Sequence, residues 1–223
     1  MGELMLQVAF IPVTPFQQNC AILLDEDTKA AVIVDPGGDA EIICDAVKEF
    51  GLTVEAIWLT HGHLDHAGGA EAVKTALNVD IIGPHEADAP ILASIADTAK
   101  TYGMPPGMEN ATPDKWLAHG DELSFAGHIF EVRHTPGHAP GHVIFICHAS
   151  KLIVMGDVLF EGSIGRTDLP GGDEATLAKT MREQVLTLPD DYNFICGHTP
   201  PSSIGQERAS NPVLAQLLAS HPA

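Results

Sequence analysis

A short segment that follows an apolar run concentrates side chains able to bind metal ions. It reads Thr60-His61-Gly62-His63-Leu64-Asp65-His66 and follows residues 54–59, which are strand-like. Neutral imidazole and carboxylate are ligands that zinc, iron and manganese accept at neutral pH, whereas a structural core has no reason to collect so many groups that are costly to desolvate. The segment therefore predicts a metal site. A polar surface loop with coincidental histidines is the alternative.

The spacing within this segment predicts how its residues share metals. His61 and His63 are two positions apart, which excludes the helical His-Glu-x-x-His zinc motif, because the two would point to different helix faces. In an extended turn both imidazoles point the same way and can hold one metal. Asp65 and His66, where the chain turns into a helix, can reach a second metal.

Three later residues can complete the site, since each follows a predicted strand. They are His138 after the Pro136-Gly137 turn, Asp157 after residues 152–156, and His198 after residues 193–197. Glycine precedes all three, and the lack of a side chain beside a ligand lets the backbone approach a metal closely.

Two further residues are candidates for supporting roles. Asp35 can hold a ligand imidazole, because a metal-bound histidine usually donates its other N–H to a carboxylate or carbonyl group. Ordinary turn capping explains Asp35 almost as well. His142 is a possible ligand in place of His138, and a structural hydrogen-bonding role is expected for it if His138 is the ligand.

The elements that must position these residues are short strands and helices. Strands are predicted at residues 4–11, 20–24, 30–34, 54–59, 79–82, 123–125, 128–132, 143–147, 152–155 and 193–196. Helices are predicted at residues 40–50, from Gly68-Gly69 through Ala76, at a segment carrying Ile91, Leu92, Ile95 and Ala99, and at residues 174–188 and 213–219. Strands cluster at the start and in the middle, each group followed by helices. The pattern predicts an α/β protein with two β-layers covered by helices, in one domain over residues 1–223.

Composition limits the partners of the chain. Lys plus Arg number 11 and Asp plus Glu 30, which gives a formal net charge of −19. Such a field repels phosphate backbones, so we expect no nucleic-acid partner. No apolar run approaches the ~18 residues of a membrane span, and the N-terminus lacks the basic and apolar regions of a signal sequence, so we expect no membrane partner and a cytoplasmic location. The four cysteines have no Cys-x-x-Cys spacing, which predicts buried reduced thiols.

Together these motifs resemble the metallo-β-lactamase superfold, whose architecture is a four-layer αββα sandwich. The residues that match that family's metal ligands in order are His61, His63, Asp65, His66, His138, Asp157 and His198. The resemblance implies two divalent metal ions, with zinc expected and iron or manganese as alternatives. It assigns His61, His63 and His138 to one metal, Asp65, His66 and His198 to the other, and Asp157 as the bridge. A carboxylate can offer one oxygen to each of two cations ~3.5–4 Å apart.

Within the superfold the chain is most similar to the glyoxalase II branch, the hydroxyacylglutathione hydrolases. The segments that carry this likeness are residues 13–20, 35–38, 156–160, 165–168 and 211–212. Two features depart from the branch. Thr199 stands where a glycine commonly follows the last ligand histidine, and the C-terminal helical domain that supplies much of the glutathione grip is missing. The chain therefore resembles the short form of the branch.

The expected chemistry suits a thioester. Two cations sharing a water would lower its pKa from ~15.7 toward ~7, giving a metal-bridging hydroxide that Asp65 could orient. The substrate carbonyl oxygen can lean on one metal, which stabilises the tetrahedral oxyanion. A thiol, with a pKa near ~8.5, leaves as thiolate without needing a proton, whereas an amide nitrogen does not.

The leading hypothesis is hydrolysis of an S-2-hydroxyacylglutathione, such as S-lactoylglutathione, to glutathione and a 2-hydroxy acid. Arg166 is the candidate that binds an anionic group of this small-molecule substrate, because by resemblance it lies where glyoxalase II places a basic glutathione-binding residue. A surface ion pair is the alternative for Arg166. Residues 101–114, rich in Gly, Pro and Met, are a candidate rim or lid of the site or an inert surface loop.

Other functions remain open at this point. The main alternative is a mononuclear Fe(II) persulfide dioxygenase acting on glutathione persulfide, in which His61, His138 and Asp157 form a facial triad. A non-catalytic binding module is a third possibility, and lactamase or lactonase activity is a weaker one. The sequence indicates no oligomeric state.

Overall fold

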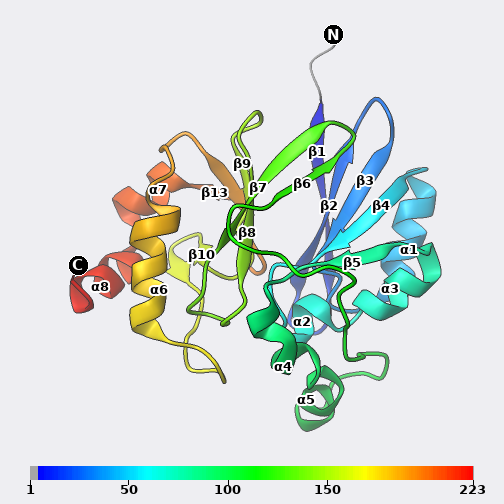
Figure 1. Cartoon of the computed structure of the whole chain (residues 1–223), viewed down its shortest axis with the longest axis horizontal. Helices are drawn as coiled ribbons and strands as arrows, with labels where there is room; N and C mark the ends of the chain where they lie inside the picture. The colour runs from blue at the N-terminus through cyan, green and yellow to red at the C-terminus, as the bar shows by residue number, and fades with distance from the viewer. Residues whose placement is uncertain (1–4, 223) are drawn as a thin grey trace.

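Two β-sheets face each other at the centre of the molecule (Figure 1). The computed structural model describes residues 5–222. The first sheet has the strand order β1-β2-β3-β4-β5 and consists of β1 (Leu6–Val13), β2 (Gln18–Asp25), β3 (Ala30–Val34), β4 (Thr53–Trp58) and β5 (Asp80–Ile82). The second has the order β13-β12-β9-β8-β7-β6 and consists of β6 (Glu122–Phe125), β7 (His128–His134), β8 (Val143–Cys147), β9 (Leu152–Val154), β12 (Asn193–Ile195) and β13 (Ser202–Ser203). A small hairpin pairs β10 (Leu159–Phe160) with β11 (Ser163–Ile164).

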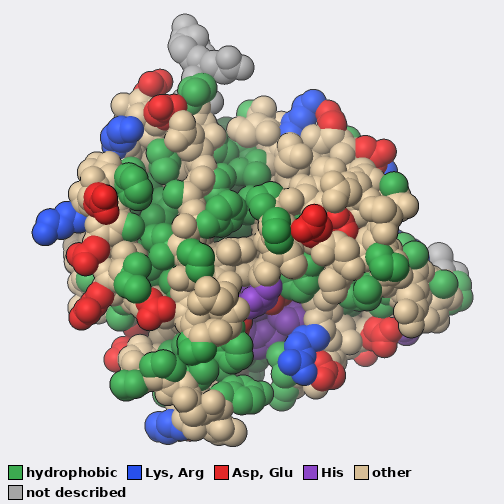
Figure 2. Space-filling model, turned by 180° about the vertical axis from the view of Figure 1, so that it is seen from behind, with side chains coloured by type: hydrophobic (Ala, Val, Ile, Leu, Met, Phe, Trp, Pro, Cys, Tyr) green, Lys and Arg blue, Asp and Glu red, His purple; other side chains and the backbone are tan. Residues whose placement is uncertain are grey.

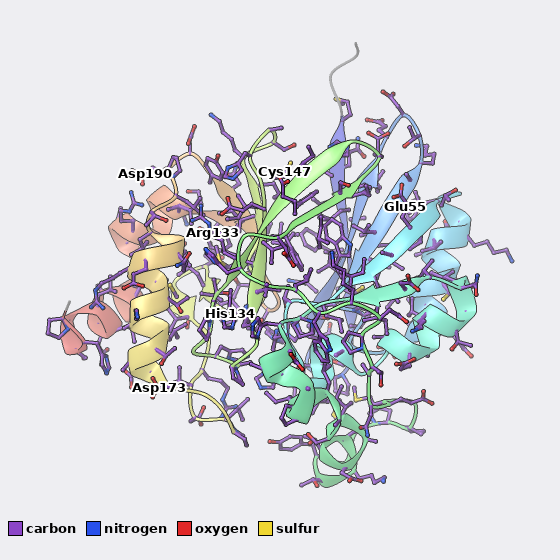
Figure 3. The ribbon with its side chains drawn as sticks, viewed as in Figure 1. Glu55, Arg133, His134, Cys147, Asp173 and Asp190 are labelled. Carbon is purple, nitrogen blue, oxygen red and sulfur yellow. The ribbon has the colours of Figure 1, made fainter. Side chains whose placement is uncertain are left out.

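Helices cover the outer faces of both sheets. On the first sheet lie α1 (Ala40–Glu49), α2 (Leu64–Ala67) and α3 (Ala70–Leu77), followed along the chain by the short helices η1 (Glu86–Asp88), α4 (Ala89–Leu92) and α5 (Ile95–Thr101). On the second lie α6 (Glu174–Thr180), which continues into the π-helical turn η2 (Met181–Val185), α7 (Ile204–Ser210) and α8 (Pro212–Ser220). Asp173, labelled in Figure 3, caps α6 by accepting the Thr176 N–H at 2.7 Å.

The apolar side chains form three buried clusters, which confirms the predicted four-layer αββα architecture. One cluster lies between the sheets, and the other two lie between each sheet and its helices. Trp58 is at the centre of the cluster between the sheets, where its ring contacts Phe125, Phe130 and Phe145 at centroid distances of 6.0, 5.2 and 5.4 Å. Such aromatic contacts add to the stabilisation that comes from burial alone.

Strand direction brings the segments that carry the candidate ligands to one edge of the sandwich. In the second sheet β9 is parallel to β12, and β7 runs in the same direction because both β7 and β9 are antiparallel to β8. In the first sheet β3 is parallel to β4. The residues that follow the carboxyl ends of β4, β7, β9 and β12 meet at this edge, as the contacts of His63 with His138 and of Asp65 with His198 show, and they include the whole candidate metal set.

Most elements predicted from the sequence are present. The antiparallel opening β1-β2-β3 is confirmed, and so is the hairpin at Ala126-Gly127, where both residues have positive φ values of 47° and 86°. Leu4, part of the predicted first strand, lies outside the described residues. All four cysteines are free thiols, as expected, although Cys44 is only partly buried.

One predicted helix is wrong. The segment carrying Ile91, Leu92, Ile95 and Ala99 forms two helices, α4 and α5, instead of one. The break falls at Ser94, whose N–H and hydroxyl both bond to the Ile91 carbonyl three residues earlier, so the helical i to i−4 pattern stops there. The short elements β10, β11, β13 and α7 were not expected from the sequence.

Candidate metal centre

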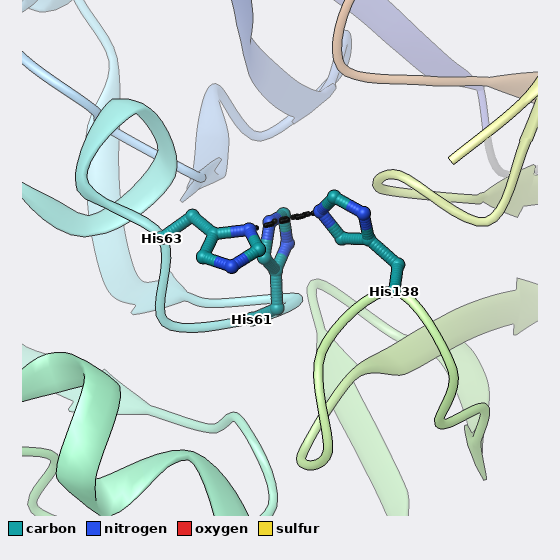
Figure 4. A group of neighbouring side chains, drawn as sticks. All are labelled: His61, His63 and His138. Carbon is teal, nitrogen blue, oxygen red and sulfur yellow. Dashed lines mark hydrogen bonds between the residues drawn. The ribbon is translucent and has the colours of Figure 1, made fainter. Parts of the chain in front are cut away.

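His61, His63 and His138 form the first cluster of candidate ligands (Figure 4). His61 and His63 lie in the loop after β4, and His138 lies in the loop after β7. His138 Nε2 is 2.9 Å from His63 Nδ1, the contact drawn in Figure 4, and 3.3 Å from His61 Nε2. All three side chains are buried or nearly so.

Hydrogen bonds on the far side of two of these rings set their tautomers. His138 Nδ1 donates to the Arg166 carbonyl oxygen at 2.7 Å. The Thr60 hydroxyl donates to Asp35 Oδ2 at 2.6 Å, so it accepts from His61 Nδ1 at 3.0 Å. The Nε2 atoms of His61 and His138 therefore carry free lone pairs, and both face the space shared with His63.

The geometry of this cluster fits a divalent metal ion. In tetrahedral coordination with metal–nitrogen bonds of ~2.0–2.1 Å, ligand nitrogens lie ~3.3 Å apart. The separations of 2.9 and 3.3 Å are close to that value. Burial, followed by repulsion from the neighbouring histidines, lowers the pKa of His63 to about 3 and that of His61 well below its usual value, so the imidazoles are neutral, as metal ligands must be.

The second cluster consists of Asp65, His66 and His198, with Asp157 beside it. Asp65 Oδ2 and His198 Nε2 are 3.2 Å apart, and Asp157 Oδ2 lies 3.3 Å from His198 Nε2. The same Asp157 oxygen is 3.6 Å from His138 Nε2 of the first cluster. Asp157 thus lies between the two clusters, the position expected for a bridging carboxylate.

Two atoms of this second cluster are buried without a hydrogen bond. His66 Nε2 and Asp157 Oδ1 face each other at 3.3 Å, within ion-pair distance, but neither atom makes a hydrogen bond of good geometry among the described residues. Buried polar atoms without partners are rare in native proteins and call for a ligand or an ion. A divalent cation would satisfy both, so the donor set of the second cluster also fits a metal.

The charge state of the second cluster is opposite to that of the first. Burial disfavours the imidazolium form of His66, but the negative charges of Asp157 and Asp65 outweigh it and hold the pKa of His66 well above its usual value. Burial of His198 is likewise outweighed by hydrogen bonds to Asp157 and Asp65, which raise the pKa of His198 to about 9. A metal at this cluster would therefore replace protons.

Two supporting residues expected from the sequence contact the candidate ligands. Asp35 Oδ2 accepts a hydrogen bond from His66 Nδ1 at 2.9 Å, in addition to the Thr60 hydroxyl. His142 makes structural hydrogen bonds, as expected. Its Nε2 accepts the Asp157 backbone N–H at 3.0 Å, and its Nδ1 therefore donates to Thr135 Oγ1, also at 3.0 Å.

The glycines that precede the last three candidate ligands serve close packing. A Cβ at Gly197 would overlap the Asp157 carboxylate and the His66 ring, and one at Gly156 would lie 2.5 Å from His142 Nε2. Gly197 thus allows the backbone to approach the candidate ligands, as expected, whereas Gly156 makes room for the His142 ring. At Gly137 the reason differs, because a Cβ there would meet the backbone of Leu177 in α6.

A groove of about 770 Å³ opens above the two clusters. Figure 2 shows histidine side chains at the bottom of a hollow on this face, with hydrophobic side chains beside them. The apolar part of the lining consists of Phe16, Leu64, Ile91, Ile95, Phe160, Ile164, Leu169 and Pro170. His63, Asp65, His138, Asp157 and His198 are also exposed to the groove, so a bound molecule would reach the candidate ligands.

Arg166 lies on the lining of the groove, but its side chain has a partner. The guanidinium forms two hydrogen bonds of 2.7 Å with Asp168, and both side chains are more than 60% exposed. The Arg166 guanidinium holds the pKa of the Asp168 carboxyl at about 2. The position of Arg166 is thus compatible with a surface ion pair and with substrate binding, and its role in substrate binding stays a prediction.

The segment of residues 101–114 contributes to the rim only at its beginning. Thr101 and Tyr102 line the groove. Beyond them the segment is tied to the body of the protein, since the Glu109 N–H donates to the Gly68 carbonyl at 3.0 Å and Asn110 Oδ1 accepts the Ala96 N–H at 2.9 Å. A function as a lid stays a prediction.

Sequence reasoning missed two residues that contact the centre from behind. Thr60 links Asp35 to His61, although its place directly before His61 was a signal that could have identified it. Asp88 contacts the loops of the first cluster and not its ligand side chains, because it accepts the backbone N–H groups of Gly62 and Gly141. Its neighbouring sequence indicates only a helix start.

Comparisons with known proteins agree with this geometry. The sequence profile of the metallo-beta-lactamase superfamily matches residues 13–198. The hydroxyacylglutathione hydrolase GloC of Haemophilus influenzae is 44% identical over 210 residues, which cover 94% of this chain and 98% of that protein. Among solved structures, the BLEG-1 B3 metallo-beta-lactamase superposes with a TM-score of 0.85 at 37% identity, covering 93% of this chain and 99% of that one. TTHA1623, solved in a di-iron-bound form, has a TM-score of 0.82 at 32% identity and covers 92% and 98%.

These matches span nearly the whole chain, and the fold and the histidine clusters imply binding of divalent metal ions. Among the described residues no helix is long and apolar enough to cross a membrane. The chain therefore belongs to the metallo-beta-lactamase superfamily, in which it is a metallo-hydrolase.

Proposed function

We propose that this protein is a thioester hydrolase that converts an S-2-hydroxyacylglutathione, such as S-lactoylglutathione, to glutathione and a 2-hydroxy acid. The observation that carries the proposal is the 44% identity to the Haemophilus influenzae hydroxyacylglutathione hydrolase over nearly the full length of both chains. The extent of the match matters, because its 210 residues cover 94% of this chain and 98% of that protein.

Two metal ions are part of the proposal, with zinc as the expected metal and iron or manganese as alternatives. His61, His63 and His138 would hold one ion, Asp65, His66 and His198 the other, and Asp157 would bridge them. The separations of 2.9 to 3.6 Å among these donor atoms support this assignment. Divalent cations bound there would supply an activated water and a Lewis acid for the substrate carbonyl group.

The protein's own residues would orient the reaction. Asp65, with one oxygen 3.2 Å from His198 Nε2, would accept a hydrogen bond from the attacking water and so fix its direction. The groove would hold the acyl and thiol parts of the substrate against its apolar wall. The thiol would leave as a thiolate, so no residue is needed as its general acid.

Arg166 is the proposed contact for a substrate carboxylate at the mouth of the groove. Its guanidinium is exposed and always charged, and the exposed Asp168 would be displaced or shared when a substrate carboxylate binds. The formal net charge of −19 makes a local cation valuable for an anionic substrate, because the rest of the surface repels it.

Turnover measurements test the proposal. Zinc-loaded protein should release free thiol from S-D-lactoylglutathione, and Asp157→Ala should abolish that release, whereas the matched surface change Asp191→Ala should leave it unaltered. Oxygen uptake by iron-loaded protein on glutathione persulfide, with no thioester cleavage, would instead establish the dioxygenase. If neither substrate is consumed by metal-loaded protein, the hydrolase assignment is wrong.

A further inference from the structure

The carboxylate of Asp88 is fully buried behind the first ligand cluster and takes no part in the metal set. Each of its oxygens accepts one backbone N–H. Gly62 donates to Oδ2 at 2.8 Å, and Gly141 donates to Oδ1 at 2.5 Å. The two glycines are far apart in the sequence, so this one side chain connects two separate loops.

These two loops carry all three ligands of the first cluster. Gly62 lies between His61 and His63, and Gly141 lies three residues after His138. Gly141 also directly precedes His142, whose ring accepts the backbone N–H of Asp157. A shift of either loop against the other would change the separation between the His138 nitrogen and those of His61 and His63.

The backbone of Gly141 packs closely against Asp88, and Gly62 lies near it as well. A Cβ at Gly141 would lie 2.7 Å from Asp88 Cγ, and one at Gly62 would lie 3.4 Å from Asp88 Cβ. The segment that carries Asp88 is fixed to the same loop, because the His85 N–H donates to the Gly141 carbonyl at 3.0 Å and the Asp88 N–H donates to the His85 carbonyl at 3.0 Å. Gly141 is thus held on both sides, because its own N–H donates to Asp88 and its carbonyl accepts the His85 N–H.

Charge makes the position of Asp88 unusual. Burial raises the pKa of Asp88 to about 6, and the N–H groups of Gly141 and Gly62 offset only part of that effect. Among residues 5–222 no Lys, Arg or His lies within ion-pair distance of this carboxylate. A buried carboxylate without a neighbouring cation lowers the stability of the fold, so stabilisation of the fold does not explain why Asp88 lies there.

We propose that Asp88 is a positioning residue, which holds the loop of His61 and His63 at a fixed distance from the loop of His138 and so determines the affinity of the first metal. This inference rests on the metal centre of the proposed function and is independent of the substrate. An amide cannot replace the carboxylate, because it has one accepting oxygen and its NH₂ group would face the second glycine N–H.

Zinc affinity in Asp88→Asn tests this inference, measured by competition with a chromophoric chelator on full-length protein. The affinity of one of the two zinc ions should fall ~10–100-fold, the effect typical of residues that orient metal ligands, while that of the other changes little. In a His198→Ala background, which retains the first cluster, the same Asp88→Asn change should weaken the remaining zinc by a similar factor. Gly141→Ala should repeat the effect, because it displaces Asp88.

The control is Asp25→Asn, which also converts a buried carboxylate to an amide. Asp25 accepts hydrogen bonds from Thr28 and His128 and lies at the far end of β2 from Gln18, which contacts His66. The seven residues of strand that separate Asp25 from Gln18 span about 23 Å. Folded Asp88→Asn with wild-type affinity for both zinc ions would overturn the inference, as would an equal loss in Asp25→Asn. If the wild-type protein binds no zinc, iron or manganese, the metal centre of the proposed function is wrong. That result differs from normal zinc binding in Asp88→Asn, which refutes the role of Asp88 alone, so the two failures are distinguishable.

Discussion

Asp35 Oδ2 lies 2.9 Å from His66 Nδ1 and accepts a hydrogen bond from it. The same carboxylate accepts the Thr60 backbone N–H at 2.7 Å and the Thr60 hydroxyl at 2.6 Å. Through Thr60 it also reaches His61, so one buried acid supports a candidate ligand in each cluster. The contact of Asp35 with one ligand imidazole was expected from the sequence. Its connection through Thr60 to a second ligand imidazole, that of His61, was not.

Asp35→Asn should therefore weaken metal binding. The new NH₂ group would face His66 Nδ1, which favours the tautomer with the proton on Nε2, the atom that must be free for a metal. We expect metal affinity to fall ~10–100-fold, with thioester turnover falling in parallel. Isothermal titration with zinc would measure this change, and Asp45→Asn on the surface of α1 is the control. Unchanged affinity in Asp35→Asn would contradict the role.

Metal loading should release protons at one cluster only. The pKa of His198 is raised to about 9 and that of His66 is also raised, whereas the pKa values of His61, His63 and His138 are lowered, so near pH 7 the second cluster holds more protons than the first. Affinity of the second cluster should rise with pH up to about 9, and affinity of the first should change little between pH 6 and 8. Calorimetric titrations in buffers of different ionisation enthalpy count the protons. Equal proton release at both sites would refute this assignment.

Arg166→Ala should raise the KM for S-lactoylglutathione by about 2- to 5-fold without a matching change in kcat, because an exposed ion pair contributes about 0.2–1 kcal/mol. The Arg166 carbonyl that accepts from His138 is retained in this variant, so the metal centre should be unchanged. Arg208→Ala is the matched control, since Arg208 also forms an exposed ion pair, with Asp190. Steady-state kinetics at low and high salt would measure the effect. A KM that does not change would leave Arg166 as a surface ion pair only.

Phe145→Ala should destabilise the protein by about 3–5 kcal/mol, because it removes a fully buried ring from the cluster between the sheets, 5.4 Å from Trp58. Ile129→Ala, at a residue that is 57% exposed in the second sheet, should change stability by about 0.5 kcal/mol or less. Urea unfolding of the metal-free protein would compare the two variants. Similar losses of stability in the two variants would show that the apolar cluster between the sheets is not the main core.

The parts of the site that the sequence predicted are those coded by local pattern. His61, His63, Asp65 and His66 share one loop, and their types and spacing indicate a metal site before any tertiary contact is known. His138, Asp157 and His198 could be found because each follows a short apolar strand. Elements with a clear apolar period, such as β3 at Ala30–Val34, have the predicted bounds.

The parts that could not be predicted depend on contacts between distant segments or on single local contacts that no pattern encodes. Asp88 acts on Gly62 and Gly141, 26 and 53 residues away, and nothing in its neighbouring sequence identifies these partners. The side chain of Arg166 pairs with Asp168 two residues later, but a local pairing of this kind does not decide between an ion pair and substrate binding, so the sequence left the two as equal alternatives. The break between α4 and α5 depends on a single local hydrogen-bond choice at Ser94, which periodicity does not detect.

The decisive measurement for a two-metal thioester hydrolase is the metal content per chain of freshly purified protein, followed by S-lactoylglutathione turnover in the same sample. A centre with two metals and a thioester substrate predicts two equivalents of zinc, iron or manganese per chain and turnover that falls as a chelator removes them. One tightly bound iron per chain, with oxygen uptake on glutathione persulfide and no thioester cleavage, would contradict the assignment as a two-metal thioester hydrolase.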